Sequence, residues 1–162
     1  MQADYVEIFT KESKEIAGPH KNVSLPFNHI SARAIIVRKK DGSIVGTLHR
    51  KKGRYALPGG AMEDGESTLE AAKRELEEEN FSLDNPVWDP CLAVDFFYGY
   101  KELSVWHIVV VDDASFGYSE ENIESRWISQ DEDLWYEGMH ENIILALKKC
   151  RPELCTKTVK VF

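Results

Sequence analysis

The sequence has few cysteines, and their spacing fits none of the sites that cysteines usually build. The three cysteines are Cys91, Cys150 and Cys155, and no two of them have the Cys-x-x-Cys spacing of a zinc site or a redox motif. An odd number without a spacing motif also argues against a disulfide framework. We therefore expect three buried or incidental thiols.

Long apolar runs are also absent. No stretch of about 18 apolar residues occurs, so the sequence predicts no membrane-spanning helix. The N-terminal stretch, MQADYVEIFTKESKE, carries acidic residues where a secretory signal would have an apolar segment. These two observations predict a cytoplasmic protein without a membrane partner.

Positive charge is in the minority. The 162 residues carry a formal net charge of −8, which argues against broad electrostatic attraction to nucleic acid. Clustered acids can instead attract hard divalent cations, which bring phosphates with them. Because 43% of the residues are hydrophobic, the composition is globular, and we expect one domain with a substantial core.

Strand patterns outnumber helix patterns along the chain. The apolar run from Ala34 to Val37, the turn at Asp41-Gly42 and the alternation after it predict a hairpin. Residues 87–100 and 102–113 are the next two strand candidates. Residues 1–29 fit either a strand pair or a short amphipathic helix, and the pattern does not decide between them.

Two capping boxes predict where the helices begin. Ser67 with Glu70 predicts a helix from about Thr68 to Glu79, after a loop that Pro58 and two glycines keep irregular. The core side of this helix would carry Leu69, Ala72 and Leu76. A second box, Ser129 with Glu132, predicts a helix from Leu134 to Lys149. Its expected buried stripe is Met139, Ile143, Ala146 and Leu147.

The first predicted helix carries an unusual concentration of carboxylates. Glu75, Glu78 and Glu79 lie three and four positions apart, so helical pitch places them on one side. Like charges at this spacing repel one another unless a cation lies among them. Oxygen ligands suit Mg²⁺ or Mn²⁺, so the segment predicts a metal site for a phosphate-containing substrate.

The spacing of this segment resembles the Nudix box of the Nudix hydrolases. The matching pattern is LPGG, then Gly60-x5-Glu66-x7-Arg74-Glu75-Leu76-x-Glu78-Glu79. The resemblance implies the αβα sandwich of that family, an α/β (α+β) fold with a mixed β-sheet, over residues 1–162 as a single domain. It also implies hydrolysis of a diphosphate linkage in a nucleoside diphosphate derivative or a nucleoside triphosphate.

The resemblance implies a role for each matching residue. Glu75, Glu78 and Glu79 would hold Mg²⁺ or Mn²⁺, with the Gly60 carbonyl as a further ligand. Arg74 would orient the carboxylates through an ion pair with Glu66, and Gly59 would let the backbone approach a phosphate closely. The general base would be a box glutamate or a glutamate of a later loop, and the loop candidates are Glu120, Glu121 and Glu124. Since many relatives are dimers, a homodimer is compatible with the family.

The chain departs from the family pattern directly after the paired glutamates. The family continues with any residue, a glycine and an aliphatic residue, whereas this chain has Asn80, Phe81 and Ser82. A phenylalanine at positive φ would be strained, and asparagine tolerates that conformation better. We therefore expect the helix to stop one residue early at Asn80, with Leu83 replacing the aliphatic contact.

Several other residues admit both a structural and a functional interpretation. The basic residues Arg50, Lys51, Lys52 and Arg54 precede the box, and Arg54 is the nearest candidate for a phosphate clamp. Among the aromatic residues Phe96, Phe97, Tyr98 and Tyr100, one or two could stack on a nucleobase. We interpret His49, His107 and His140 as structural and the four tryptophans as core or interface residues.

Two alternatives to a small-molecule hydrolase remain open from the sequence. One is a Nudix-fold module that binds a nucleotide with little or no catalysis, which the departure at Phe81 and Ser82 supports. The other is removal of 5′ ends from RNA, which the basic cluster allows and the acidic net charge disfavours.

Overall fold

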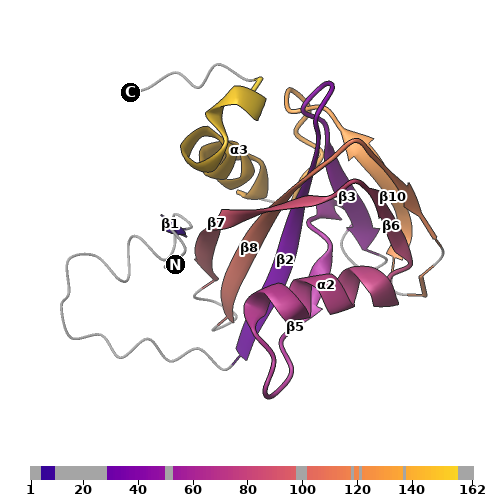
Figure 1. Cartoon of the computed structure of the whole chain (residues 1–162), viewed down its shortest axis with the longest axis vertical. Coiled ribbons are helices and arrows are strands. Elements are labelled where there is room, and N and C mark those ends of the chain that lie inside the picture. The colour runs from indigo at the N-terminus through magenta and orange to yellow at the C-terminus, as the bar shows by residue number, and fades with distance from the viewer. Residues whose placement is uncertain are drawn as a thin grey trace.

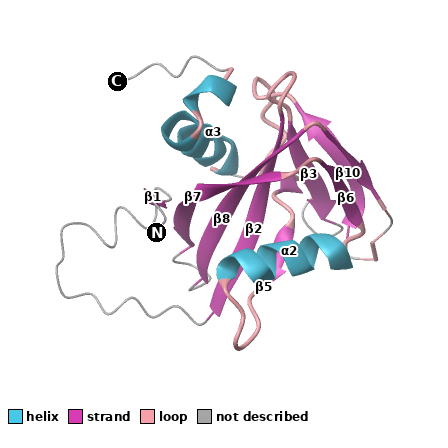
Figure 2. Cartoon of the chain, in the orientation of Figure 1, coloured by secondary structure: helices cyan, strands magenta, loops and turns pink. Residues whose placement is uncertain are grey.

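The structure is a computed structural model that describes most of the chain. The described residues are 5–9, 29–49, 53–97, 102–117, 119–120, 122–136 and 138–156. In this part of the chain, strands form a central twisted sheet and helices lie on its two sides (Figures 1 and 2). The predicted αβα architecture with a mixed sheet is therefore confirmed.

The elements follow one another in an order rich in strands. The strands are β1 (Tyr5–Phe9), β2 (His29–Arg38), β3 (Ile44–His49), β4 (Tyr55–Ala56), β5 (Gly59–Ala61), β6 (Phe81–Asp84), β7 (Val87–Phe97), β8 (Glu102–Val111), β9 (Asp113–Phe116) and β10 (Asn122–Ile128). The helices are α2 (Thr68–Glu78), α3 (Met139–Cys150) and the short 3₁₀ helix η2 (Pro152–Leu154).

The main sheet mixes parallel and antiparallel pairs. Its strand order is β1-β7-β8-β2-β3-β10, with β4 added to β3 and β5 added to β2. The central pair, β2 and β8, is parallel along its whole length, whereas β7 with β8 and β3 with β10 are antiparallel. A separate two-stranded sheet joins β6 to β9. The parallel centre explains why β2 and β8 are apolar on both faces.

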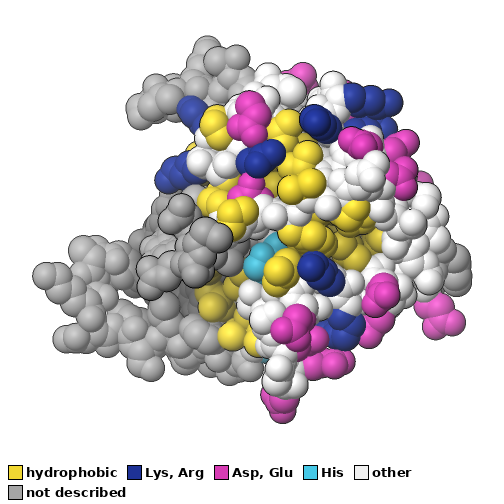
Figure 3. All heavy atoms as spheres, viewed as in Figure 1, with side chains coloured by type: hydrophobic (Ala, Val, Ile, Leu, Met, Phe, Trp, Pro, Cys, Tyr) yellow, Lys and Arg dark blue, Asp and Glu magenta, His cyan; other side chains and the backbone are white. Residues whose placement is uncertain are grey.

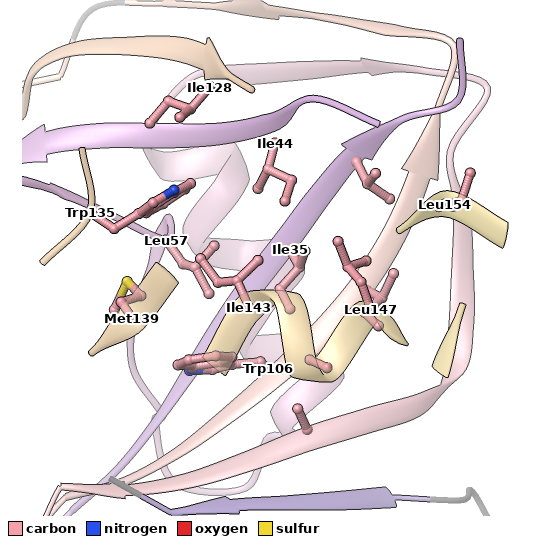
Figure 4. Packing of buried hydrophobic residues seen from close by; sticks show 14 of the residues in the cluster. Ile35, Ile44, Leu57, Trp106, Ile128, Trp135, Met139, Ile143, Leu147 and Leu154 are labelled. Atoms are coloured by element: carbon pink, nitrogen blue, oxygen red, sulfur yellow. The ribbon is translucent and has the colours of Figure 1, made fainter. Parts of the chain in front are cut away.

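Alternating residues of β2 point to opposite faces and enter different cores. Ile35 and Val37 join a large cluster under α3, together with Ile143 of that helix (Figure 4). Ala34 and Ile36 lie on the opposite face, in a smaller cluster that includes Leu76 of α2. Each helix therefore covers one face of the sheet.

The first predicted hairpin is present, and the loop after it is more regular than expected. Arg38 and Ser43 bracket the turn at Asp41-Gly42, and the amide of Arg38 donates to the Ser43 carbonyl at 2.9 Å. The segment predicted as an irregular loop contains β4 and β5 instead. The prediction was wrong because the glycines of β5, which suggested a loop, are the residues that let the backbone pair with β2.

The second helix begins later than its predicted capping box. The Ser129 side chain accepts a hydrogen bond from the Asp131 amide in a turn, and α3 starts only at Met139. Gly138, at φ 81°, occupies the N-cap, because a left-handed residue there reorients the chain into the helix. The expected buried stripe is confirmed, since the residues Met139, Ile143, Ala146 and Leu147 are all buried.

Two further expectations need correction. Cys91 of β7 and Cys150 of α3 form a disulfide, because folding brings together two residues that no local spacing motif connects. Cys155 takes no part in a disulfide with another described residue. The strand predicted over residues 102–113 ends at Val111, and Asp113 begins a separate strand, β9, which pairs with β6.

The N-terminal segment and the membrane prediction were tested only in part. Tyr5–Phe9 forms β1, which pairs in parallel with β7, and the rest of 1–28 lies outside the described residues. Among the described residues, no helix is both long and apolar enough to cross a membrane.

Candidate active site at the acidic helix

Helix α2 begins and ends where its sequence predicts. The Ser67 side chain caps the first turn by accepting a hydrogen bond from the Glu70 amide at 3.1 Å. Glu79 is the C-cap, and Asn80 adopts the left-handed conformation at φ 61°. The predicted early stop at Asn80 is therefore confirmed, and Phe81 enters β6 without positive φ. Both Phe81 and Leu83 pack against the core under α2.

The buried side of α2 is built from small residues. Ala71 and Ala72 are fully buried against Ala32 of β2, and Leu76 is buried near them. Leu69 is only half-buried, so Ala71 takes the core position that we predicted for Leu69. Alanines at this contact let the helix axis approach the sheet closely, which fixes the height of the carboxylates above β5.

The Gly59-Gly60 strand supports the site from below. Gly59 pairs with Arg33 and Gly60 pairs with Ala32. A Cβ atom on Gly60 would lie 2.5 Å from Oε1 of Glu75, so this carboxylate rests directly against the Gly60 backbone. Gly59 has φ 150°, and a Cβ atom there would lie 2.2 Å from the Ala32 carbonyl oxygen. The contact at Gly59 is with backbone and excludes a side chain, whereas a side chain at residue 60 would displace the Glu75 carboxylate.

Arg74 is the centre of the charged network. Its Nε and Nη2 atoms donate to both oxygens of Glu66, at 3.0 and 2.8 Å. Its Nη1 atom donates to Glu75 Oε1 at 3.1 Å and to both oxygens of Glu78 at 3.2 Å. Nη2 also donates to the Ala61 carbonyl at 3.0 Å, which ties the network to β5. The expected Arg74–Glu66 ion pair is thus present.

These contacts shift the ionisation of both partners. The hydrogen bond from Arg74 lowers the pKa of Glu66, with a further contribution from the Glu63 backbone amide. Hydrogen bonding to Glu66 raises the pKa of Arg74, and Glu78 adds to this effect. Both groups therefore stay charged at neutral pH, and Glu66 holds the arginine in a fixed two-pronged geometry.

The three predicted metal ligands differ in exposure. Glu79 is buried, Glu75 is mostly buried with 16% of its side chain exposed, and Glu78 has 57% exposed. Figure 3 shows acidic side chains gathered with basic ones along the lower edge of the molecule, over α2 and the loop before it. Within the described part of the chain, no three acidic, histidine or cysteine side chains form a ready-made metal cluster. The guanidinium of Arg74 lies between Glu75 and Glu78 instead.

The donor set nevertheless fits a hard divalent cation. Glu75, Glu78 and Glu79 offer carboxylate oxygens, which Mg²⁺ and Mn²⁺ prefer. The contact between Glu75 and Gly60 brings a carboxylate against a backbone strand whose carbonyls are further oxygen donors. Residue 60 itself adds no side chain to this junction, because it is a glycine.

The candidate general bases are distributed differently from the prediction. Glu124 belongs to β10 rather than to a loop, and it accepts a hydrogen bond from the Tyr55 hydroxyl. Glu120 is exposed just before β10, and Glu121 lies outside the described residues. Sequence reasoning missed Tyr55, whose partner is 69 positions away.

The basic and aromatic candidates are only partly described. Arg54 is exposed, and its Nη1 atom donates to the Trp135 carbonyl at 3.4 Å. The remaining candidates lie outside the described part of the chain. They are the basic residues Arg50, Lys51 and Lys52, the side chains of Phe96 and Phe97, and the residues Tyr98 and Tyr100.

Two of the three histidines have structural roles, as predicted, and the His49 side chain lies outside the described residues. Nε2 of His107 lies 2.9 Å from the Thr68 hydroxyl at the start of α2. Burial, with a smaller contribution from Lys73, lowers the pKa of His107 to about 4. His140 is buried, with Nε2 lying 2.6 Å from the Gln130 carbonyl.

The tryptophans also pack as predicted. Trp106 and Trp135 are buried in the core under α3. Trp88 and Trp127 pack at the margins of the cores on the α2 side.

A family model decides the classification. The NUDIX domain model matches residues 28–143, which is most of the chain. The chain belongs to the Nudix family. The predicted resemblance is therefore confirmed, and so is the prediction of a Nudix hydrolase at the level of the family. No curated protein matches the chain.

Solved structures with the same fold are distant in sequence. A UDP-X diphosphatase aligns with TM-score 0.60 at 21% identity, covering 88% of this chain and 71% of that one. A MutT protein from Methanosarcina mazei Go1 aligns with TM-score 0.58 at 19% identity, covering 80% and 99%. A bifunctional NMN adenylyltransferase/ADP ribose pyrophosphatase from Francisella tularensis, complexed with AMP and a manganese ion, aligns with TM-score 0.60 at 20% identity, covering 86% and 45%. At these identities the likeness establishes the fold alone.

Proposed function

We propose that this Nudix protein is a pyrophosphohydrolase that uses Mg²⁺ or Mn²⁺ to cleave a diphosphate linkage in a nucleoside diphosphate derivative or a nucleoside triphosphate. The observation that carries the proposal is the junction of Gly60 with Glu75, held by Arg74. It joins a backbone strand, an acidic helix and a charged clamp at one point. Structural neighbours named as a UDP-X diphosphatase and an ADP ribose pyrophosphatase support the substrate class.

Each residue of the Nudix box would have a role set by its position in the site. Glu75, Glu78 and Glu79 would hold the divalent ion, with the Gly60 carbonyl as a further oxygen ligand. Bound there, the ion would supply Lewis-acid polarisation of a phosphoryl oxygen and a lower pKa for water. Arg74 would keep Glu75 and Glu78 in place through its hydrogen bonds, because Glu66 anchors the other edge of its guanidinium.

The reaction also needs a group that accepts a proton from the attacking water. A carboxylate of the box or a carboxylate near β10 would accept it, and Glu120 and Glu121 are the candidates before that strand. Glu124 is a weaker candidate for the base, because its carboxylate already accepts the Tyr55 hydroxyl proton in a hydrogen bond.

The proposal is tested by a screen of nucleoside diphosphate compounds with Mg²⁺ and with Mn²⁺. We expect metal-dependent release of a nucleoside monophosphate, with one oxygen of a product phosphate derived from labelled water. The labelled product identifies which phosphorus is attacked. Turnover that persists unchanged in chelator, or in a Glu78→Gln and Glu79→Gln double variant, would contradict the metal-site assignment.

The two alternatives predict different outcomes in the same screen. A binding module would bind nucleotides without releasing product, but the departure that suggested it leaves the carboxylates of α2 in place, since Asn80 terminates the helix. Removal of RNA 5′ ends would show as release of diphosphate from triphosphorylated RNA. The net charge of −8 disfavours that substrate.

A further inference from the structure

The face of the sheet under α3 changes character along its strands. Strand register places Ser31 beside Ser104 and Arg33 beside Trp106. The next residues of β2 on this face, Ile35 and Val37, belong to the large apolar core. A small polar block therefore ends an apolar face, at the end of β2 that pairs with β5.

Hydrogen bonds link most of this polar block internally. The Ser31 hydroxyl donates to Ser104 Oγ at 3.1 Å, and the Trp106 indole donates to the same oxygen at 2.8 Å. All three side chains are buried. The serines and the tryptophan thus satisfy one another, so the structure accounts for their polarity.

Arg33 is the member of the block that is not accounted for. Its Nη1 atom donates to the Leu57 carbonyl at 2.8 Å, and its buried Nε atom has no hydrogen-bond partner in the described part of the chain. Among the described residues, no carboxylate forms an ion pair with it. A half-buried cation with unused donors costs free energy in the empty protein, which a bound anion would offset.

The position of Arg33 relates it directly to the acidic helix. Its Cγ atom would lie 2.9 Å from a Cβ atom on Gly59, while the Glu75 carboxylate lies against Gly60. Neighbouring residues of a strand face opposite sides. Arg33 and Glu75 therefore flank the same strand, β5, one on each side. A substrate held at Glu75 would reach Arg33 by extending around this strand.

We propose that Arg33 is a substrate-binding residue that selects nucleotides carrying phosphate charge beyond the linkage held at the acidic helix. This inference rests on the proposed function, since it takes a nucleotide as the substrate. Guanidinium donors pair with phosphate oxygens in a two-pronged geometry, and Arg33 has donors free to do so. The Arg33 guanidinium lies outside the acidic cluster, so it would bind the phosphates whose charge the divalent ion does not neutralise.

The experiment compares the affinities of AMP, ADP and ATP by calorimetry without divalent cations, so that neither metal binding nor turnover contributes. In the wild type we expect affinity to rise by about tenfold or more from AMP to ATP, the size of a charge-assisted hydrogen bond. In Arg33→Gln this rise should disappear, with AMP affinity changed less than about threefold. Arg33→Lys, which keeps the charge and loses the fork, should retain part of it.

Arg38→Gln is the matched control, because Arg38 lies on the same strand and is paired with Asp41 away from the site. It should preserve the rise from AMP to ATP. A wild type without this rise, or an Arg33→Gln variant that keeps it, would overturn the inference. If Arg33→Gln does not fold, Arg33→Lys decides: an unchanged rise overturns the inference, and a reduced rise supports it.

The result is separable from the proposed function. Binding that depends on Arg33 in a protein that hydrolyses nothing in the screen would reject the hydrolase and keep this site. If the protein hydrolyses nucleotides but its nucleotide affinity does not depend on Arg33, the proposed hydrolase stands and the role of Arg33 is rejected.

Discussion

The two faces of the sheet are built for different purposes. The face under α3 holds the largest buried side chains, including Trp106, Trp135 and Ile143. The face under α2 is lined near the site by alanines, and its helix carries a partly buried charged network. The comparison teaches that large apolar side chains stabilise one face, while small residues on the other let a helix lie close enough to position Glu75 against Gly60.

The largest expected effect is on turnover, from replacing a carboxylate of α2. Glu79→Gln should lower turnover by roughly two to four decades, since Glu79 is a proposed metal ligand and such a ligand contributes several kcal/mol to the transition state. The fold should survive, because the side chain keeps its size. Rates are measured on purified protein whose unfolding midpoint is recorded in parallel. Wild-type turnover in this variant would remove Glu79 from the site.

The next largest effect is on stability, from opening a cavity in the core under α3. Ile143→Ala should lower the free energy of unfolding by about 2–5 kcal/mol, because it opens a cavity in the main core. Turnover per folded molecule should change little, if the two faces are independent. Urea denaturation gives the stability, and the exposed Val87, replaced by alanine, is the control with an expected change below about 0.5 kcal/mol.

A smaller effect is expected at the strand between the two faces. Gly59→Ala should cost about 1–3 kcal/mol of stability, because its φ of 150° and its contact with the Ala32 carbonyl both exclude a Cβ atom. Gly65→Ala is the matched control, since Gly65 also has positive φ, at 83°, but open space around it. Equal losses in the two variants would show that backbone conformation alone, and not the close contact, requires Gly59.

The effect expected to be smallest at neutral pH concerns the contact between β8 and the start of α2. His107 has its pKa lowered to about 4, so the unfolded chain binds its proton more readily than the folded one. Stability should therefore be fully present above the ordinary histidine pKa and decline as pH falls from there towards 4. His107→Gln should flatten this part of the stability profile, measured by urea midpoints. An unchanged slope in the variant, with His29→Gln as the exposed control, would assign the decline to other groups.

The α2 region was largely predictable from local sequence. The Ser67 cap, the start at Thr68 and the stop at Asn80 all depend on hydrogen bonds and backbone preferences within a few residues. Such features are decided by short-range chemistry, so the sequence pattern is sufficient to locate them. The Arg74–Glu66 pair, by contrast, was expected only from the resemblance to the Nudix box.

The α3 region was predicted less well, for the same physical reason. The helix starts at Met139, after a left-handed Gly138, although Ser129 and Glu132 have the spacing of a cap. A capping box is only a local option, and the turn at Ser129 is instead fitted to its long-range neighbours, among them the Gln130 side chain, which donates to the Gly42 and Leu154 carbonyls. Cys91 and Cys150, 59 positions apart, likewise pair only because β7 lies beside α3.

The sequence by itself determined the family, the acidic helix with its ends, and the alternation that divides each strand between two cores. Helical pitch, capping and strand periodicity are local, so they can be read without knowing the fold. Only the tertiary structure decided that Glu75 rests on Gly60 and that Arg33 lies across the same strand with unused donors. Those relations depend on which strands become neighbours, and β2 meets β5 in a register that long-range packing selects.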